Sequence, residues 1–290
     1  MIRFSDFYQN KQTTFSIEIY PPKTERGALH LFEELTLLKA IHPAFVSVTY
    51  GAMGSTRHLT KDLALKIHQE LEMTTAFHFT CVGLYKEEIK KYVNKLADAG
   101  LSLVVALRGD IPTEMGTVFV PPANGFCYAN ELVIYLREFN RFSIAVAGYP
   151  EKHIEAKSFD EDLKNLKRKV ESGADIIITQ LFFDNEDYYR FVDRVRKMGI
   201  HQPVIAGIMP ILSFEQIEKI TKMCGAKVPQ NLSERLLLAK EDPQKIRQIG
   251  IEHAIRQCQD LVKQGVPGIH FYCLNKSYAV LKVVEGLKTA

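Results

Sequence analysis

The chain has 290 residues, of which 46% are hydrophobic and 24% are charged, values that are ordinary for a soluble globular protein with a sizeable core. Its 37 basic and 34 acidic residues leave a formal net charge of +3, which is too balanced to indicate a nucleic-acid partner. No apolar run is long enough to span a bilayer, and residues 1–15 lack the apolar core of a signal peptide. We therefore expect a cytoplasmic protein that has neither a nucleic-acid nor a membrane partner.

Eight short apolar runs rich in β-branched and aromatic residues predict strands. In chain order they are "TFSIEIYPP" (14–22), "AFVSVTYG" (44–51), "AFHFTCVG" (76–83), "LVVALRGD" (103–110), "SIAVAGYP" (143–150), "DIIITQLFFD" (175–184), "PVIAGIMP" (203–210) and "GIHFYCLN" (268–275).

Amphipathic helical patterns separate most of these runs. One pattern ends at Gly100, a residue type typical of helix C-termini. A second begins at Ser158, with Glu161 three residues later, as in a capping box. A third begins at Asp242, with Pro243 at the first helical position.

Strands that alternate with helices predict an α/β fold, and eight of them predict a single (β/α)8 TIM barrel formed by one domain over residues 1–290. The length beyond a minimal barrel falls at roughly residues 225–265, where we expect extra helices between the seventh and eighth strands. A doubly wound open sheet is the alternative fold, although its G-x-G-x-x-G signature is absent.

In a barrel, the C-terminal ends of the strands converge on one pocket. Polar residues stand at most of these ends, and small residues follow several of them, as in "SVTYGAMGSTR" (47–57). A single corner of this kind is more often a plain turn, but its recurrence favours a site where the backbone approaches a ligand closely. The long segment 111–127 lies at the same end of the predicted barrel.

Glu18 interrupts an apolar strand and is the most informative single residue. A carboxylate there is either a partly exposed strand residue with an ordinary pKa or an acid tuned for proton transfer. A Glu that is protonated near pH 7 needs a pKa raised by roughly 2.5 units, which burial and a second carboxylate such as Asp110 can supply. Asp110 could equally form a loop salt bridge, and His78 could be a satisfied core residue.

The predicted helix after residue 158 places a carboxylate, an amide and two cations on about a third of its circumference. These residues are Asp162, Asn165, Arg168 and Lys169. Such a face suits a ribose and a pyrophosphate, although an ordinary solvated face has the same composition. The five cysteines are scattered, and neither a C-x-x-C nor an H-E-x-x-H motif occurs, so we expect no metal site.

The chain resembles the methylenetetrahydrofolate reductase family in its short bacterial form without a regulatory domain. The resemblance covers nearly the whole chain and rests on "FSIEIYPPK", "FVSVTYGA", "LRGD", "AGYPEKHIEAKS", "DLKNLKRKVESGAD" and "ITQLFFD". It implies a barrel that holds FAD non-covalently and reduces 5,10-methylenetetrahydrofolate to 5-methyltetrahydrofolate with NADH or NADPH, in one-carbon metabolism and methionine biosynthesis. It is also compatible with a homo-oligomer.

The resemblance implies roles for individual residues. Glu18 would be the acid that opens the folate ring, and Asp110 would lie between the pterin and the flavin. Gln180, Gln216 and Lys276 would contact folate or nicotinamide. The residues that would contact FAD are Thr49, Tyr50, Ala52, His78, Arg108, Gly109, Asp110, Tyr128, Ala129, Tyr149, His153, Ala156, Asp162, Asn165, Arg168 and Lys169.

Two positions depart from the family pattern. Ile220 replaces an aromatic residue that stacks on the substrates, and Lys276 replaces an Arg whose planar fork a Lys cannot reproduce. Both departures bear on the choice of electron donor.

Two other functions remain open. One is a barrel that only binds folate or scaffolds a complex. The other is a barrel lyase or aldolase, which would need a strand-end Lys or metal ligands.

Overall fold

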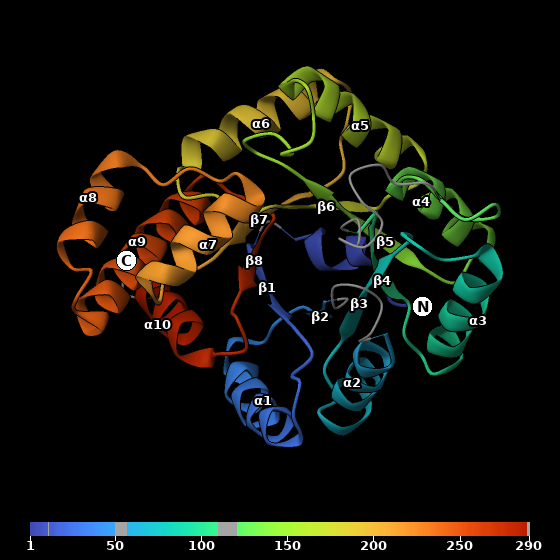
Figure 1. Cartoon of the computed structure of the whole chain (residues 1–290), viewed down its shortest axis with the longest axis horizontal. Helices are drawn as coiled ribbons and strands as arrows, with labels where there is room; N and C mark the ends of the chain where they lie inside the picture. Colours follow the sequence, from blue (N-terminus) through green and yellow to red (C-terminus); the bar gives the residue numbers. More distant parts are fainter. Residues whose placement is uncertain (11, 50–56, 110–120, 289–290) are drawn as a thin grey trace.

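The computed structural model describes residues 1–10, 12–49, 57–109 and 121–288. Within these ranges the strands form a closed parallel barrel in chain order, and Figure 1 shows the helices arranged around it. The strands are β1 (Thr14–Ile19), β2 (Val46–Val48), β3 (Thr75–Thr80), β4 (Leu103–Leu107), β5 (Ser143–Gly148), β6 (Ile176–Thr179), β7 (Val204–Ile208) and β8 (Gly268–Tyr272).

The helices follow the strands in alternation. They are α1 (Glu25–Leu38), α2 (Arg57–Glu70), α3 (Lys86–Asp98), α4 (Ala129–Glu138), α5 (Phe159–Glu171), α6 (Asn185–Lys197), α7 (Phe214–Cys224), α8 (Gln230–Leu238), α9 (Pro243–Lys263) and α10 (Ser277–Lys288), with the 3-10 turns η1 (Phe4–Tyr8) and η2 (Lys39–Ile41). The extra helices predicted for residues 225–265 are α8 and α9, which lie together with α7 on one side of the barrel (Figure 1).

The pairing of β1 with β8 closes the sheet and excludes the doubly wound alternative. Glu18 stands opposite Ser47 of β2 on one side and Tyr272 of β8 on the other. The predicted (β/α)8 barrel is therefore confirmed. Each predicted run extends past the C-terminal end of the observed strand, because the run includes residues of the corner that follows the strand.

The predicted helix starts are confirmed by their capping bonds. The Ser158 hydroxyl accepts a hydrogen bond from the Glu161 amide at 3.1 Å. The Asp242 carboxylate accepts the amides of the second and third residues of α9, both at 3.0 Å. These bonds satisfy amides that would otherwise lack a partner in the first turn, so the local sequence fixes where α5 and α9 begin.

The sheet separates two parts of the core, and a third apolar cluster joins α7, α8 and α9. Outward-facing strand residues such as Ile17 pack against the helices in the largest apolar cluster. Inside the barrel, a second cluster fills the N-terminal end, where fully buried Phe4 of η1 packs edge-to-face on Phe45 with ring centroids 5.1 Å apart. Because apolar side chains fill that end, the space for a ligand lies at the C-terminal ends of the strands.

Candidate active site

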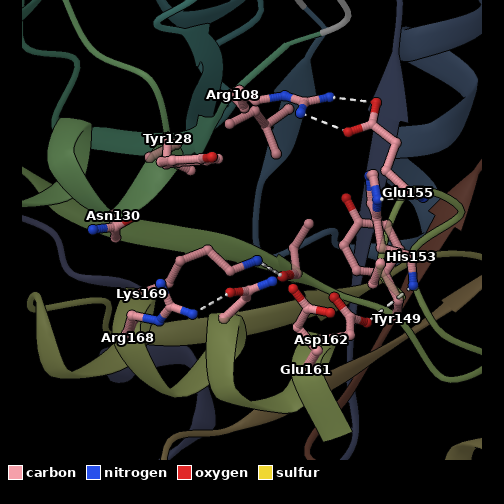
Figure 2. A pocket seen from close by; sticks show the side chains of 16 residues that line it. Arg108, Tyr128, Asn130, Tyr149, His153, Glu155, Glu161, Asp162, Arg168 and Lys169 are labelled. Carbon is pink, nitrogen blue, oxygen red and sulfur yellow. Dashed lines mark hydrogen bonds and ion pairs between the residues drawn. The ribbon is translucent and has the colours of Figure 1, made fainter. Parts of the chain in front are cut away.

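A cleft of about 390 Å³ lies at the C-terminal ends of β4 and β5, against the helices α4 and α5 (Figure 2). Its lining brings together ten of the residues that the resemblance assigns to cofactor binding. They are Arg108, Tyr128, Ala129, Tyr149, His153, Ala156, Asp162, Asn165, Arg168 and Lys169. The elements β4, α4, β5 and α5, whose lining residues are up to about sixty positions apart in the sequence, thus contribute to one cavity of ligand size.

Two cations of α5 line this cleft in different ways. Arg168 is exposed and donates to the amide oxygen of Asn165 at 2.7 Å. Lys169 is half-buried, and its Nζ donates to the Ala147 carbonyl at 2.5 Å and lies 5.7 Å from the centre of the Tyr149 ring. Burial lowers the pKa of Lys169 to about 8. Of these two α5 cations, Lys169 therefore titrates just above neutral pH.

An arginine–carboxylate pair joins the end of β4 to the loop between β5 and α5. The guanidinium of Arg108 donates to both carboxylate oxygens of Glu155, at 2.6 and 2.7 Å. Its Nε also donates to the Gly109 carbonyl at 3.2 Å. In the view of Figure 2, this pair lies on the opposite side of the cavity from Arg168 and Lys169. The cleft is therefore bordered by a charge-balanced arginine–carboxylate pair on one side and by the two α5 cations on the other.

The turn between β5 and α5 is fixed by hydrogen bonds within itself. The Asp162 carboxylate accepts the His153 amide at 3.0 Å, and burial raises the pKa of Asp162. The Nζ of Lys152 donates to the carbonyls of His153 and Ala156, at 3.0 and 2.6 Å. The His153 ring packs edge-to-face on Tyr149 with centroids 4.6 Å apart. The wall that this turn gives the cleft is thus held by several bonds.

Glu18 lies inside the barrel beside two histidines. Its Oε2 is 3.2 Å from His78 Nε2 and 3.5 Å from His270 Nε2. His270 is fully buried, and its Nδ1 lies 2.8 Å from the hydroxyl of Ser16. The hydroxyl of Ser47 is within 3.4 Å of both histidine rings. These five residues form a polar layer above the apolar end of the barrel.

The pKa of Glu18 differs from both sequence-based alternatives, an ordinary value and a raised one. Burial by itself raises this pKa, but the charge and hydrogen bonds of His78 and His270 outweigh burial and lower the pKa to about 2. Glu18 is accordingly a carboxylate at neutral pH in the ligand-free protein.

The polar layer follows from strand alternation. Every second side chain of a barrel strand points inward, so Ser16 and Glu18 of β1 share the interior with His270 of β8. The sequence analysis missed Ser16, Ser47 and His270, although each is polar at the inward-facing position of a predicted strand. That alternation is the signal that could have found them.

The remaining predicted residues lie elsewhere at the same end of the barrel. Thr49 follows β2 and accepts the Thr60 hydroxyl at its carbonyl. Gln180 and Tyr149 line a much smaller cavity of about 10 Å³, so the aromatic ring of Tyr149 borders both cavities. Gln216 lies in the first turn of α7, and Lys276 is exposed after β8. Tyr50, Ala52 and Asp110 lie outside the described residues.

Ile220 is half-buried on α7 and packs against the apolar cluster that joins α7, α8 and α9.

Three polar residues of the cleft were missed by the sequence analysis. Glu155 lies within the motif "AGYPEKHIEAKS", Asn130 directly follows Ala129, and Glu161 stands beside Asp162. Their neighbours in the sequence had been assigned, so motif context alone could have suggested them.

The described part of the chain contains no cluster of three or more His, Cys, Asp or Glu residues arranged to hold a metal ion. Across the same residues, no helix is both long and apolar enough to cross a membrane.

A closed parallel barrel with a charged cleft and a half-buried carboxylate at its C-terminal strand ends is the architecture of a (β/α)8-barrel enzyme. The sequence comparisons assign the family: the model of methylenetetrahydrofolate reductase matches residues 3–288, and the chain belongs to this family. The resemblance seen in the motifs is thereby confirmed over nearly the whole chain.

Bacterial and eukaryotic relatives differ in how much of their length the chain covers. The chain is 36% identical to 5,10-methylenetetrahydrofolate reductase of Escherichia coli strain K12, over 93% of this chain and 90% of that protein. It is 37% identical to the Pectobacterium carotovorum protein of the same name, over 91% and 88%. It is 36% identical to methylenetetrahydrofolate reductase (NADH) 1 of Arabidopsis thaliana, over 95% of this chain but 48% of that protein. The chain spans about half the length of such eukaryotic relatives.

Among solved structures, an uncharacterized Clostridium thermocellum protein that binds two copies of 5-methyl-5,6,7,8-tetrahydrofolic acid superposes with a TM-score of 0.65. The two chains are 13% identical, and the match covers 99% of this chain and 98% of the other. Dihydropteroate synthase from Xanthomonas albilineans gives a TM-score of 0.51 at 10% identity, over 96% and 94% of the two chains. At these identities the likeness supports the fold alone.

Proposed function

We propose that this protein reduces 5,10-methylenetetrahydrofolate to 5-methyltetrahydrofolate, with a reduced nicotinamide nucleotide as electron donor and FAD as a non-covalently bound cofactor. The observation that carries the proposal is a cleft of about 390 Å³, lined in part by Arg108, Arg168 and Lys169, at the same end of one barrel as the half-buried carboxylate of Glu18. This reaction belongs to one-carbon metabolism and the supply of methyl groups for methionine.

The donor set of the cleft fits a flavin dinucleotide. Arg168 and Lys169 supply the charge that a pyrophosphate requires, and the amide of Asn165 can bond a hydroxyl. Asp162 can accept a hydrogen bond from a ribityl or ribose hydroxyl, and Tyr149 offers an aromatic surface. A bound flavin would supply hydride transfer between the nicotinamide and the folate. Contacts of Tyr50, Ala52 and Asp110 with the cofactor remain predictions.

The Glu18 cluster fits the proton requirement of folate reduction. The five-membered ring of the substrate opens only when its departing nitrogen gains a proton, and the resulting electrophilic carbon then accepts the hydride. His78 and His270 both face Oε2 of Glu18, so they are placed to exchange a proton with the carboxylate that would deliver it to this nitrogen. Glu18 is therefore proposed to touch the folate, and the two histidines to hold the proton.

NADH is the donor to test first, because the Arabidopsis relative carries NADH in its name. Gln180 and Gln216 are proposed to contact folate or nicotinamide. Ile220 offers an aliphatic surface there in place of an aromatic ring, and Lys276 offers a single ammonium group in place of a guanidinium fork. Both departures predict a weaker hold on the nucleotide than in family members with an aromatic residue and an Arg.

The two half-reactions test the proposal separately under anaerobic conditions. The purified protein should be yellow, NADH or NADPH should bleach its flavin absorbance, and methylenetetrahydrofolate should restore it with formation of 5-methyltetrahydrofolate. A protein that binds folate but neither flavin nor nucleotide would support the binding or scaffolding function instead. Flavin that is bleached by nucleotide but never recoloured by the folate would refute the substrate assignment.

A further inference from the structure

The contact between Arg108 and Glu155 has no assigned purpose in the proposed reaction. Glu155 was not among the residues expected to bind the cofactor, yet it lines the cleft and occupies both outer nitrogens of Arg108. A fork of this kind has two short parallel bonds and a fixed geometry, unlike a loose surface ion pair. The fork joins the end of β4 to the loop between β5 and α5, two segments that belong to successive strand–helix units of the barrel.

Both ends of the fork are themselves held in place. The Nε of Arg108 donates to the carbonyl of Gly109, at the strand end. The backbone amide of Glu155 donates to His153 Nδ1 at 3.1 Å, and Lys152 ties the carbonyls on either side of Glu155. The carboxylate of Glu155 therefore projects from a fixed turn, and it can orient a long, flexible side chain that would otherwise sample many rotamers.

Charge and exposure agree with this role. The Arg108 side chain is 23% exposed and that of Glu155 is 52% exposed, so the guanidinium is the more enclosed partner. The Arg108 guanidinium lowers the pKa of Glu155, which keeps the carboxylate ionised at neutral pH. An arginine loses up to about 2 kcal/mol of rotamer entropy when it is immobilised. A partner that immobilises it in advance removes that cost from the binding step.

We propose that Glu155 is a positioning residue that acts through Arg108, holding the guanidinium over the cleft so that a bound dinucleotide leaves slowly. The inference rests on the proposed function, because the ligand it retains is the FAD proposed above. Pre-organisation of this kind changes the dissociation rate more than the association rate. It does not require Glu155 to touch the cofactor.

The test compares FAD dissociation from Glu155→Gln and wild-type holoprotein, followed by the return of free-flavin fluorescence after dilution. We expect the variant to release FAD about tenfold faster, while apoprotein and FAD associate at a rate within about threefold of wild type. The ratio of the two dissociation rates should shrink as salt rises from 50 to 500 mM, on the order of a threefold reduction, because the half-exposed pair is screened. A residue with a merely structural role would not produce this rate split or this salt dependence.

Glu138→Gln is the matched control, because Glu138 is an exposed carboxylate at the C-terminal end of α4 that lies outside the lining of the cleft and belongs to no ion pair within the described residues. It should change the dissociation rate less than about twofold. An equal acceleration in both variants, or none in Glu155→Gln, would overturn the positioning role.

A second measurement separates this inference from the proposed function. In the ligand-free protein, the outer Nη groups of Arg108, which bond Glu155, should be ordered by 15N relaxation in wild type and mobile in Glu155→Gln. An immobile Arg108 in the variant would refute the inference even if FAD binds. A wild-type protein that binds no FAD would refute the proposed function, and with it the retention of FAD by Arg108, whatever the relaxation data show.

Discussion

Inside the barrel, Nε2 of His78 lies 3.2 Å from Oε2 of Glu18, and this contact joins a carboxylate of β1 to an imidazole of β3 across β2. His270 approaches the same oxygen from β8 at 3.5 Å. Within the part of the chain that the structure describes, four titratable side chains interact electrostatically with Glu18: these two histidines, Tyr272 and Cys273. Of these, only the histidines can carry positive charge, and they stabilise the ionised carboxylate.

This arrangement predicts how stability depends on pH. The pKa of Glu18 is lowered from 4.5 to about 2 by folding, so ionised Glu18 stabilises the fold fully above the unfolded value. The stabilisation is lost as pH falls through the folded value. Linkage over this shift gives about 3 kcal/mol in total, of which about 2 kcal/mol is lost by pH 3.

Urea unfolding of wild type and Glu18→Gln at pH 6 and pH 3 measures the difference in free energy of unfolding between the two proteins at each pH. A gap between the two proteins that is the same at both pH values would contradict the lowered pKa.

The glycine after Arg108 gives a second prediction. Gly109 has φ near +90°, and a Cβ added there would lie 2.8 Å from Cβ of Thr80. We expect Gly109→Ala to destabilise the protein by about 1–3 kcal/mol in urea unfolding, because it combines backbone strain with a clash.

Gly199→Ala is the control, since Gly199 has φ near +77° and an added Cβ would meet no other part of the described chain within 4 Å. That variant should cost about 1 kcal/mol, from strain alone. Equal losses would mean that the close approach to Thr80 is unimportant.

The barrel and its capped helices could be predicted from the sequence because their signals are local. Strand composition, the caps at Ser158 and Asp242, and the strand–helix alternation are each read within a short window. The pKa of Glu18 could not be predicted in the same way. It depends on His270, which lies more than 250 residues away and becomes a neighbour only when β8 closes on β1.

The helix face of α5 shows the same limit at a smaller scale. The 3.6-residue period correctly places Arg168 and Lys169 on one side of the helix. It treats them as equivalent cations, whereas Arg168 is exposed and Lys169 is half-buried against the Ala147 carbonyl. Burial depends on the neighbouring strand β5, so periodicity within one helix could not distinguish the two residues.

That difference gives a third prediction. Folding lowers the pKa of Lys169 from 10.5 to about 8, so the unfolded chain binds more protons between these values and stability rises with pH across that window. Binding of an anionic dinucleotide should show the opposite trend, because the free protein loses the Lys169 charge above pH 8. If bound phosphate keeps Lys169 protonated, the dissociation constant of FAD should be about tenfold higher at pH 9 than at pH 7.

Lys169→Met and Arg168→Ala separate the two cations in this experiment. The first should weaken FAD binding at pH 7 and abolish most of the pH dependence between pH 7 and pH 9. The second should weaken binding by a similar amount but leave the pH dependence intact, since an arginine stays protonated throughout. A pH dependence that survives in Lys169→Met would assign the titration to another group.

The last prediction concerns the reaction itself. Glu18→Gln preserves the size of the side chain and its ability to hydrogen-bond, but it removes the group that passes a proton to the folate. Reduction of the flavin by NADH needs no such proton donor, so its rate should stay within about tenfold of wild type, whereas the folate half-reaction should fall by about 10²–10⁴-fold. Anaerobic stopped-flow absorbance measures the two rates separately.

Arg168→Ala, once saturated with FAD, is the control and should not split the half-reactions. Equal losses in both for Glu18→Gln would identify Glu18 as a structural carboxylate, and unchanged rates in both would remove it from the mechanism.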